Sequence, residues 1–489
     1  MGDPTARNGQ EMKVGSHGEV DGLEKPDSDD TIVAISTAVG PGAIGIVRLS
    51  GPQAIGIAGM DFVAARGEPL RSDETYRLLY GHVVDPRTGE VVDEALLAVM
   101  RKPHSYTRED VVELHCHGGV AAQRAVLRLM VRSGARLAEP GEFTRRAFVN
   151  GRIDLAQAES VAAVVAARSA GALRVAVRQL DGGLSERLRA VRRDMVSLLA
   201  HMEAGLDFVD DEVDDVDWEA VADGLTKTRE SLLRLLRTAL VGRALEHGVR
   251  TAIVGRPNVG KSSLLNALLM RERAIVSDIP GTTRDTVEEL LEIGGIPIHL
   301  VDTAGIRPGG DHVEQLGVAR SLKALESADL VLAVVDLSAP GDESDSQLAG
   351  AVAPERTIVV GNKVDTVATD ADVARRLAAY EEKGRRMCAV SALTGSGLDA
   401  LRHLIQEVIA GGEKVDFEEP VLAVERQRAL VAESVESVER AMAGVRGQRG
   451  DELVCEDIRI AVQALGRITG EDLTPDLLDE IFSRFCIGK

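Results

Sequence analysis

The first part of the chain alternates short apolar runs with turns rich in glycine and proline. Runs at 31–35, 45–49, 91–100 and 111–115 have the length and composition of β-strands. A helical pattern at 120–133 follows the last of them, with apolar residues three and four positions apart. These patterns predict an α/β module that ends near residue 150. The polar residues before it, 1–29, carry too few apolar side chains to offset chain entropy and predict a disordered tail.

A different pattern begins at residue 155. Alanine, leucine, valine and arginine at helical spacing predict long packed helices over 155–206 and again over 219–243. Between the two stretches lies a cluster of carboxylates: Asp207, Asp210, Asp211, Glu212, Asp214, Asp215 and Asp217. A solvated loop between helices is the simpler interpretation of this cluster, and a metal site is the alternative.

Short apolar strands that alternate with helices start at residue 250. The strands expected at 251–254, 297–301, 330–335 and 357–360 predict a mostly parallel, doubly wound sheet. Helical periodicity returns over 420–485, which predicts a helical domain interrupted by an inserted α/β domain. The chain is therefore expected to be a multidomain protein that combines α/β and all-α parts. The boundaries are a tail at 1–29, an N-terminal α/β domain at 30–150, a split helical domain at 151–247 and 413–489, and the inserted domain at 248–412.

Composition narrows the function classes. With 489 residues, 44% of them hydrophobic, the chain can bury real cores, and a net charge of −21 excludes a passive electrostatic grip on nucleic acid. Four scattered cysteines exclude a disulfide framework, and the first thirty residues lack the apolar core of a signal peptide. No apolar stretch approaches the length of a membrane-spanning helix. We expect a cytoplasmic protein without a membrane segment.

Residues 255–262 fit the phosphate-binding pattern G-x-x-x-x-G-K-[ST] between a predicted strand and a predicted helix. Glycines let backbone N–H groups surround phosphate oxygens, and the helix N-terminus adds partial positive charge. Lys261 is expected to neutralise the β- and γ-phosphates, and the Ser262 hydroxyl is expected to bind Mg²⁺.

Three further motifs follow in the required order: Asp302-Thr303-Ala304-Gly305, Asn362-Lys363-Val364-Asp365 and Ser391-Ala392-Leu393. The first can reach Mg²⁺ through water and the γ-phosphate through an amide. The Asp365 carboxylate can accept hydrogen bonds from the ring N–H and the exocyclic amine of guanine, which adenine does not offer in that arrangement. The nucleotide is therefore predicted to be GTP.

The segment 279–285, Ile-Pro-Gly-Thr-Thr-Arg-Asp, is expected to act as a switch, because a threonine there completes the Mg²⁺ shell only when a γ-phosphate is present. Many GTPases use a glutamine directly after D-x-x-G to orient water, but Ile306 occupies that position. Either hydrolysis is feeble or another polar group supplies this function. Arg256, Arg284 and Arg307 are near enough in sequence to be considered as arginine fingers.

From about residue 30 to its end, the sequence resembles the MnmE (TrmE) family of tRNA-modification GTPases. Besides the GTPase motifs, the resemblance rests on residues 30–34, 45–51, 109–119, 140–144 and 155–159 and on the ending Phe485-Cys486-Ile487-Gly488-Lys489. The resemblance implies a GTP site formed by Asn258, Val259, Gly260, Lys261, Ser262, Ser263, Ser277, Asp278, Ile279, Pro280, Gly281, Thr282, Thr283, Asp302, Thr303, Ala304, Gly305, Asn362, Lys363, Asp365, Ser391, Ala392 and Leu393.

The resemblance also implies ions and a catalytic group. Mg²⁺ would be held by Ser262 and Thr283, and K⁺ by Asn258, Ser277, Ile279 and Thr282. A monovalent cation beside the β/γ bridge supplies the charge that an arginine finger would otherwise bring. Glu314 would orient or deprotonate water in place of the missing glutamine, and the GTPase domains would pair face to face.

For the N-terminal module, the resemblance implies a folate-binding domain and a homodimer contact. Arg48, Glu113, Arg152 and Lys489 match the positions that contact 5-formyl-tetrahydrofolate or a related one-carbon carrier, although members often have lysine where this chain has Arg152. For Cys486, a catalytic role and a small buried side chain remain open. His115 and His117 share a strand face opposite Cys116, with zinc as a minor alternative.

Together these expectations describe a GTPase that works with an FAD-dependent MnmG-type partner, in a heterotetramer or larger complex. It would add a carboxymethylaminomethyl-type group to C5 of the wobble uridine of certain tRNAs. Because the chain is acidic, the tRNA would be held mainly by the partner. The alternatives are a ribosome-assembly GTPase, which usually carries a basic RNA-binding module, and a folate enzyme that uses GTP for regulation.

Overall fold

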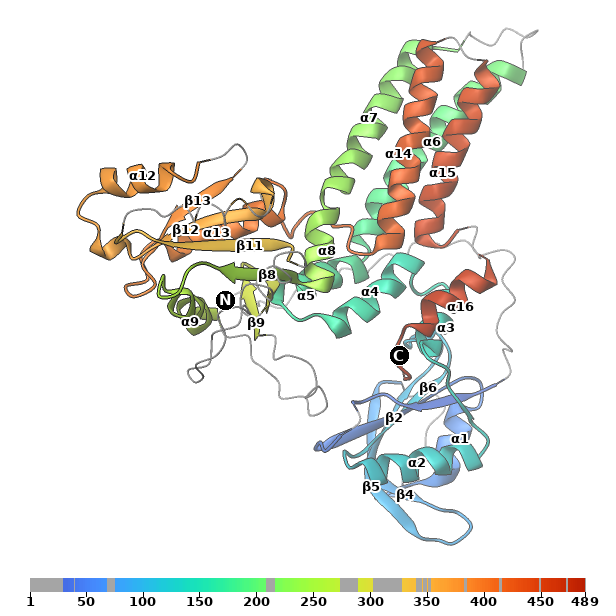
Figure 1. The fold of residues 1–489 in the computed structure, drawn as a ribbon. Helices are drawn as coiled ribbons and strands as arrows, with labels where there is room; N and C mark the ends of the chain where they lie inside the picture. Colours follow the sequence, from blue (N-terminus) through green and yellow to red (C-terminus); the bar gives the residue numbers. More distant parts are fainter. Residues whose placement is uncertain are drawn as a thin grey trace, which may run out of the picture. The chain divides into compact units, whose positions relative to one another are not determined.

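The computed structural model describes residues 30–38, 40–67, 75–207, 216–272, 289–301, 328–339, 345, 350, 353–381, 385–412, 416–447, 450–471 and 474–488 (Figure 1). The tail predicted at 1–29 lies outside these residues. The chain divides into two compact units, one built from Met1–Ala158 with Gly470–Lys489 and the other from Glu159–Thr469. In the part of the chain that is described, no helix is long and apolar enough to cross a membrane.

The first unit contains a seven-stranded sheet in the order β3-β4-β5-β6-β2-β1-β7, in which only the β1–β7 pairing is parallel. Its strands are β1 (Ile32–Ile35), β2 (Ile44–Ser50), β3 (Phe62–Ala64), β4 (Arg77–Val84), β5 (Val91–Met100), β6 (Val111–His117) and β7 (Arg136–Leu137). Its helices α1 (Ala54–Asp61) and α2 (Val120–Arg132) pack against the sheet. The predicted strands and the helix at 120–133 are confirmed; β3, β4 and β7 were not predicted.

Alternation along β6 explains how this sheet positions a site. Leu114 and Cys116 point into the core and are buried, whereas Glu113 and His115 lie on the opposite face. The predicted separation of the two histidines from Cys116 is thus confirmed. The register places Arg48 of β2 directly opposite Glu113, so both side chains stand on the face away from the core.

The end of the chain also belongs to this unit. Helix α16 (Pro475–Ser483) packs on α3 (Glu142–Val149), where the rings of Phe148 and Phe482 lie 6.5 Å apart. The predicted helical domain at 413–489 stays a prediction; by its contacts, the segment Gly470–Lys489 groups with the N-terminal module. Helical periodicity reports that a face is apolar but not which surface will cover it.

In the second unit, α6 (Gly183–Asp207), α7 (Trp218–Arg237), α14 (Glu425–Arg446) and α15 (Asp451–Thr469) form a bundle (Figure 1). The helical run predicted at 155–206 is divided into α4 (Leu155–Ala166), α5 (Ala170–Leu180) and α6. The Ser169 hydroxyl caps α5 by accepting the Ala172 N–H, and Gly182 has a φ of 95° that ends the same helix. Asp217 caps α7, and Asp210–Asp215 of the acidic cluster lie outside the described residues.

The remaining part of the second unit is a six-stranded sheet in the order β13-β12-β11-β8-β10-β9. Its elements are β8 (Val249–Val254), α9 (Lys261–Glu272), β9 (Glu289–Ile293), β10 (Ile296–Val301), β11 (Leu330–Asp336), β12 (Thr357–Asn362), α12 (Asp370–Ala378), β13 (Arg386–Ala389) and α13 (Leu398–Ile409). All pairings are parallel except β9–β10. The predicted mostly parallel sheet is therefore confirmed, and its central strands are almost wholly buried.

The sheet and the neighbouring helix α8 (Ala239–His247) share one hydrophobic core with α5. Val175 and Leu245 from these helices belong to the same buried cluster as Ile253 and Leu264 of the sheet module. The Ser169 hydroxyl additionally donates to the Gly295 carbonyl in the β9–β10 turn at 2.6 Å. The inserted module is thus packed onto α5 and α8 rather than merely linked to them.

Candidate functional site

The loop between β8 and α9 has the backbone of an anion-binding nest. Gly255, Asn258 and Gly260 have φ values of 150°, 65° and 97°, conformations that glycine adopts freely and asparagine tolerates. A Cβ on Gly260 would lie 2.2 Å from Nδ2 of Asn362, so only glycine fits there. Ser262 and Ser263 follow in the exposed first turn of α9, where a hydroxyl suits Mg²⁺ beside a bound phosphate.

Lys261 folds back over this loop. Its Nζ donates to the carbonyls of Gly255 at 2.8 Å and Arg256 at 2.7 Å. Burial lowers the pKa of Lys261, because it removes the ammonium from water. These two neutral carbonyls accept two of the three N–H groups and do not cancel the charge. The ammonium is therefore positioned to meet an anion at the loop.

Asn362 connects the phosphate loop with the loop that follows β13. Its side chain is 2% exposed; Nδ2 donates to the Val259 carbonyl at 2.9 Å, and Oδ1 accepts from the Ala392 N–H at 3.0 Å. One amide thus fixes two loops that are more than a hundred residues apart in sequence. Ser391 beside it is buried, whereas Leu393 is 86% exposed.

Lys363 and Asp336 add an ion pair next to Asn362. Lys363 has a φ of 66°, and its Nζ lies 2.5 Å from Oδ2 of Asp336 at the end of β11. Burial would raise the pKa of Asp336, but hydrogen bonds from Lys363 and Ser338 outweigh it and hold that pKa below its usual range. Asp365 is exposed in the short 3-10 turn Val364–Thr366. Sequence reasoning missed Asp336, although a carboxylate that closes a buried strand was a usable signal.

Arg256 of the phosphate loop is held by a buried carboxylate. Its Nε lies 2.8 Å from Oδ1 of Asp345 and its Nη2 lies 2.8 Å from Oδ2, while Asp345 is 3% exposed. This bidentate pair ties Arg256 to its own module. The other predicted GTPase residues lie outside the described residues: Ser277, Asp278, Ile279, Pro280, Gly281, Thr282, Thr283, Asp302, Thr303, Ala304, Gly305 and Glu314, together with Arg284 and Arg307.

A second candidate site lies on the face of the seven-stranded sheet opposite its main hydrophobic core. Arg48 Nε donates to Oε1 of Glu113 at 2.8 Å, and His115 Nε2 lies 3.1 Å from Oε2 of the same carboxylate. All three side chains are partly exposed, at 21%, 16% and 25% respectively. The carboxylate is therefore bracketed by two nitrogen groups but still reachable from solvent.

Tyr106 completes this second site. The guanidinium of Arg152 lies 4.7 Å from the ring centroid, and that of Arg48 lies 5.7 Å from it. Arg152 also donates to the Tyr106 carbonyl at 3.1 Å. Sequence reasoning missed Tyr106 and treated His115 only as a metal ligand. The alternation of β6 could have placed His115 beside Glu113, but no spacing in the sequence pointed to Tyr106.

The C-terminal residues lie against the same site. Cys486 accepts the Gly141 N–H at 3.3 Å through its carbonyl, Ile487 pairs with Pro140, and the Gly488 carbonyl lies 3.5 Å from Nη1 of Arg48. Gly488 has a φ of 92°, and a Cβ there would lie 2.3 Å from the Ile35 carbonyl. The structure thus brings three predicted folate residues and the chain end together. Lys489 lies outside the described residues, and the Cys486 side chain is exposed.

Comparisons with known proteins show to which family the chain belongs. A family model described as "GTP-binding protein TrmE N-terminus" matches residues 31–152, and one described as "MnmE helical domain" matches residues 155–486. The tRNA modification GTPase MnmE of Moorella thermoacetica is 48% identical over 464 residues, which cover 94% of this chain and 100% of that protein. The chain belongs to the MnmE family. The MnmE protein of Geobacillus kaustophilus is 43% identical over 94% of this chain and 99% of its own length.

Membership of the MnmE family confirms the fold class and the GTPase activity predicted from the motifs. This MnmE-family chain is a tRNA-modification GTPase that uses GTP, and Mg²⁺ is the ion that such hydrolysis employs. Among solved structures, Era in complex with MgGDPNP and a 16S ribosomal RNA segment is 30% identical over 39% of this chain and 66% of that chain, with a TM-score of 0.27. A TM-score this low supports no conclusion about the present chain.

Proposed function

We propose that this MnmE-family GTPase, together with an FAD-dependent MnmG-type partner, adds a carboxymethylaminomethyl-type group to C5 of the wobble uridine of certain tRNAs. A tetrahydrofolate derivative such as 5-formyl-tetrahydrofolate would supply the one-carbon unit. The observation that carries this proposal is the convergence of Arg48, Glu113, Arg152 and the C-terminal residues in one half-exposed site. A GTPase that acted only as a nucleotide-dependent conformational switch would have no need of that second site.

The chemistry of the second site suits a folate. The Glu113 carboxylate can accept hydrogen bonds from the amidine-like N–H groups of a pterin, and the guanidinium groups of Arg48 and Arg152 can pair with glutamyl carboxylates. The Tyr106 ring holds both cations at one place through cation–π contacts, with the Arg152 guanidinium 4.7 Å and the Arg48 guanidinium 5.7 Å from its centroid. Arg152 keeps the charge of the lysine common in the family, with a fork geometry that matches a carboxylate.

Glu113→Gln is expected to weaken binding of 5-formyl-tetrahydrofolate by about 10- to 100-fold, because a neutral amide loses charge-assisted hydrogen bonds worth about 1.5–3 kcal/mol. Isothermal titration calorimetry measures this change. Glu94→Gln on the neighbouring strand is a matched control, since Glu94 is exposed and bonded to Tyr80 instead of Arg48. Equal affinities for the wild type and E113Q would remove Glu113 from the folate site.

GTP hydrolysis is proposed to use K⁺ and to drive a rearrangement of domains rather than to supply carbon. Arg256 is engaged by Asp345, so a monovalent cation beside Asn258 is the proposed source of positive charge at the β/γ bridge. The other proposed K⁺ residues, Ser277, Ile279 and Thr282, and the proposed water-orienting Glu314 lie outside the described residues. Pairing of two GTPase modules would complete this site.

GTP turnover by the purified protein is therefore expected to be at least about tenfold faster in KCl than in NaCl at equal ionic strength. The measurement is the rate of phosphate release in each salt, with RbCl as a further arm because Rb⁺ is close to K⁺ in size. Indistinguishable rates in KCl and NaCl would exclude the potassium site and the role of Asn258 in it.

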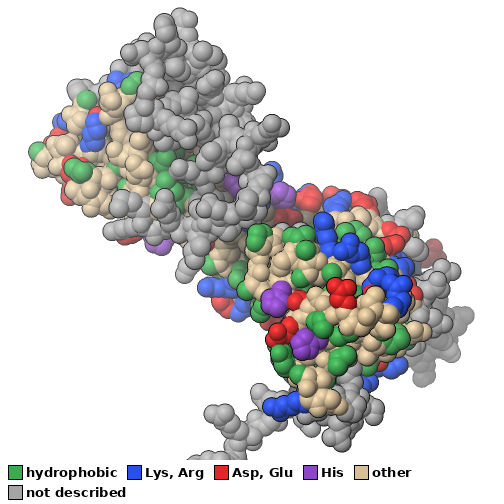
Figure 2. All heavy atoms as spheres, turned by 90° about the horizontal axis from the view of Figure 1, so that it is seen from below, with side chains coloured by type: hydrophobic (Ala, Val, Ile, Leu, Met, Phe, Trp, Pro, Cys, Tyr) green, Lys and Arg blue, Asp and Glu red, His purple; other side chains and the backbone are tan. Residues whose placement is uncertain are grey.

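The proposed partners follow from the surface and the charge. Leu78, Tyr80 and Leu96 are exposed on adjacent strands of the sheet face opposite the main hydrophobic core, and apolar side chains gathered in this way suit a homodimer contact. Figure 2 shows hydrophobic side chains scattered among charged side chains and histidines on the face in view. Because the net charge of −21 repels the phosphates of tRNA, we expect the MnmG-type partner to hold the tRNA for the most part. The proposed location of the complex is the cytoplasm.

The deciding experiment for this function is mass analysis of wobble nucleosides from cells that lack the gene. Unmodified uridine at the wobble position, restored by the wild-type gene, is the expected result. A normal nucleoside profile together with GTP-dependent co-sedimentation of the protein with ribosomal subunits would favour a ribosome-assembly GTPase instead.

A further inference from the structure

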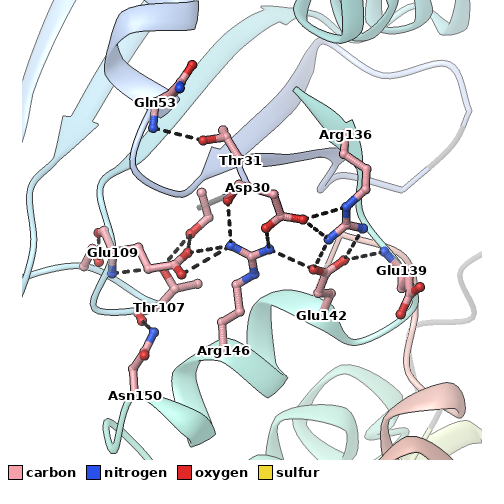
Figure 3. Close-up of polar contacts among 12 residues, drawn as sticks. Asp30, Thr31, Gln53, Thr107, Glu109, Arg136, Glu139, Glu142, Arg146 and Asn150 are labelled. Carbon is pink, nitrogen blue, oxygen red and sulfur yellow. Dashed lines mark hydrogen bonds and ion pairs between the residues drawn. The ribbon is translucent and has the colours of Figure 1, made fainter. Parts of the chain in front are cut away.

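A buried arginine with three carboxylate partners lies behind the proposed folate site. Arg146 of α3 is 2% exposed, and Figure 3 shows its guanidinium between Asp30, Glu109 and Glu142. Nη2 donates to Oδ1 of Asp30 at 2.6 Å and to Oε1 of Glu142 at 2.9 Å, and Nη1 lies 3.2 Å from both oxygens of Glu109. Arg136 joins the cluster through Asp30 and Glu142.

Stability alone is a weak explanation for this cluster. The attraction within a buried ion group is largely cancelled by desolvation, and apolar replacements of equal volume are often as stable. The Nε–H of Arg146 is also buried without a partner among the described residues. Burial would raise the pKa of Glu142, but hydrogen bonds from Arg136, Glu139 and Arg146 outweigh it, so its pKa lies below the usual range and this carboxylate is ionised at neutral pH.

One partner of Arg146, Glu109, leads directly to residues of the proposed folate site. Glu109 accepts from the Ser50 hydroxyl at 2.7 Å, and Ser50 follows Arg48 by two residues on β2. Ser50 also bonds Thr107 at 2.6 Å, the residue next to Tyr106. A change in the position of Glu109 would therefore reach both Arg48 and Tyr106.

A second partner, Glu142, leads to the C-terminal residues. Glu142 is the first residue of α3, and its carboxylate accepts the Glu139 N–H at 2.8 Å, which shapes the turn between them. Within that turn, Pro140 pairs with Ile487 and the Gly141 N–H donates to the Cys486 carbonyl. The position of Glu142 thus sets the surface on which the C-terminal residues lie.

We propose that Arg146 is a positioning residue, which aligns Tyr106, Arg48 and the C-terminal segment Cys486–Gly488 around one ligand-binding site. The proposal rests on the proposed folate function only for the identity of the ligand. Arginine suits this role because its planar fork can bond three carboxylates from three segments at once. Lysine would keep the charge, but its single nitrogen cannot replace the two separate guanidinium nitrogens that bond Glu109 on one side and Asp30 with Glu142 on the other.

The test compares Arg146→Lys with the wild-type protein by amide hydrogen exchange and by titration with 5-formyl-tetrahydrofolate. In R146K, peptides covering 104–109 and 484–488 are expected to exchange at least about tenfold faster, whereas peptides of α14 exchange unchanged. Folate affinity is expected to fall by about 10- to 100-fold, since misplacement of about 1 Å can cost that much, and GTP turnover is expected to stay within about twofold. Arg132→Lys is the matched control. Arg132, the last residue of α2, also forms an ion pair in this unit, with its Nη2 2.7 Å from Oδ2 of Asp85.

Separate outcomes identify which idea fails. If wild-type protein binds no folate but R146K still loosens 484–488, the proposed ligand is wrong and the positioning role stands. If folded R146K keeps both wild-type exchange and wild-type folate affinity, Arg146 is merely structural and the proposal is overturned. Should R146K not fold, Glu109→Gln decides the question: faster exchange at 104–109 with weaker folate binding supports the proposal, and wild-type values contradict it.

Discussion

Lys261→Ala is expected to reduce GTP turnover by about 10³-fold. The ammonium lies on two neutral carbonyls at the phosphate loop and has no carboxylate partner among the described residues, so its removal deletes the group expected to neutralise the γ-phosphate in the transition state. Losing one preorganised donor typically costs about 10²- to 10³-fold in turnover, and loss of a full charge belongs at the upper end. Single-turnover phosphate release at saturating GTP measures the effect.

Lys227→Ala provides the control for this substitution, because Lys227 is an exposed lysine on α7 in the same unit. It should leave turnover unchanged. Binding of GDP to K261A should weaken less than turnover does, since GDP lacks the γ-phosphate. Turnover by K261A above a tenth of the wild-type rate would contradict the assigned role of Lys261.

The phosphate loop was predictable from sequence because its determinants are local. Gly255, Gly260 and Lys261 belong to one contiguous segment, and the required backbone conformation follows from the residue types themselves. The parallel strands were predictable for a similar reason, since a run such as 330–335 is apolar throughout when both sheet faces are covered.

The partners of those local elements could not be predicted. Asn362 was expected in a guanine-binding motif, but its bond to the Val259 carbonyl depends on where β12 lies in the sheet beside the phosphate loop. The cluster around Arg146 likewise combines segments that begin at Asp30, Glu109 and Glu142. Without homologous sequences to reveal covariation, a single chain contains no signal for such pairs.

The break in the first helical run illustrates a different kind of miss. Ser169 and Gly182 are an N-cap and a left-handed helix end, and both signals were present in the sequence. The apolar spacing that continues on either side outweighed them. Local capping residues were therefore better guides to the helix ends than the periodicity of the whole stretch.

The two candidate sites differ in how a ligand would be fixed. The phosphate loop relies on backbone groups and one ammonium. The buried Asn362 side chain hydrogen-bonds both this loop, at Val259, and the loop after β13, at Ala392. The second site uses side chains from β2 and β6 and the chain end, supported from behind by the Arg146 cluster. In each case a buried polar residue that need not touch the ligand fixes the groups that would. Substitutions at such residues should misalign a site without removing any of its contacts.

Asp365→Asn is expected to change the preferred base from guanine to xanthine. The Asp365 carboxylate, exposed in the turn after β12, can accept two N–H groups from guanine, and each charge-assisted bond is worth about 1.5–3 kcal/mol. The asparagine amide offers one acceptor and one donor, so the exocyclic amine of guanine meets a second donor. The kcat/KM for GTP should fall by about 10²- to 10⁴-fold.

Xanthine carries a carbonyl where guanine carries that amine, so the new amide can donate to it and XTP should become the better substrate of D365N. Measuring kcat/KM for GTP and XTP with both proteins gives a ratio that a general loss of stability cannot invert. Asp370→Asn, at the exposed first turn of α12, serves as a matched acidic control and should keep the wild-type preference. A D365N protein that still favours GTP would show that another group reads the base, because repulsion between two donors leaves no route to a retained guanine preference.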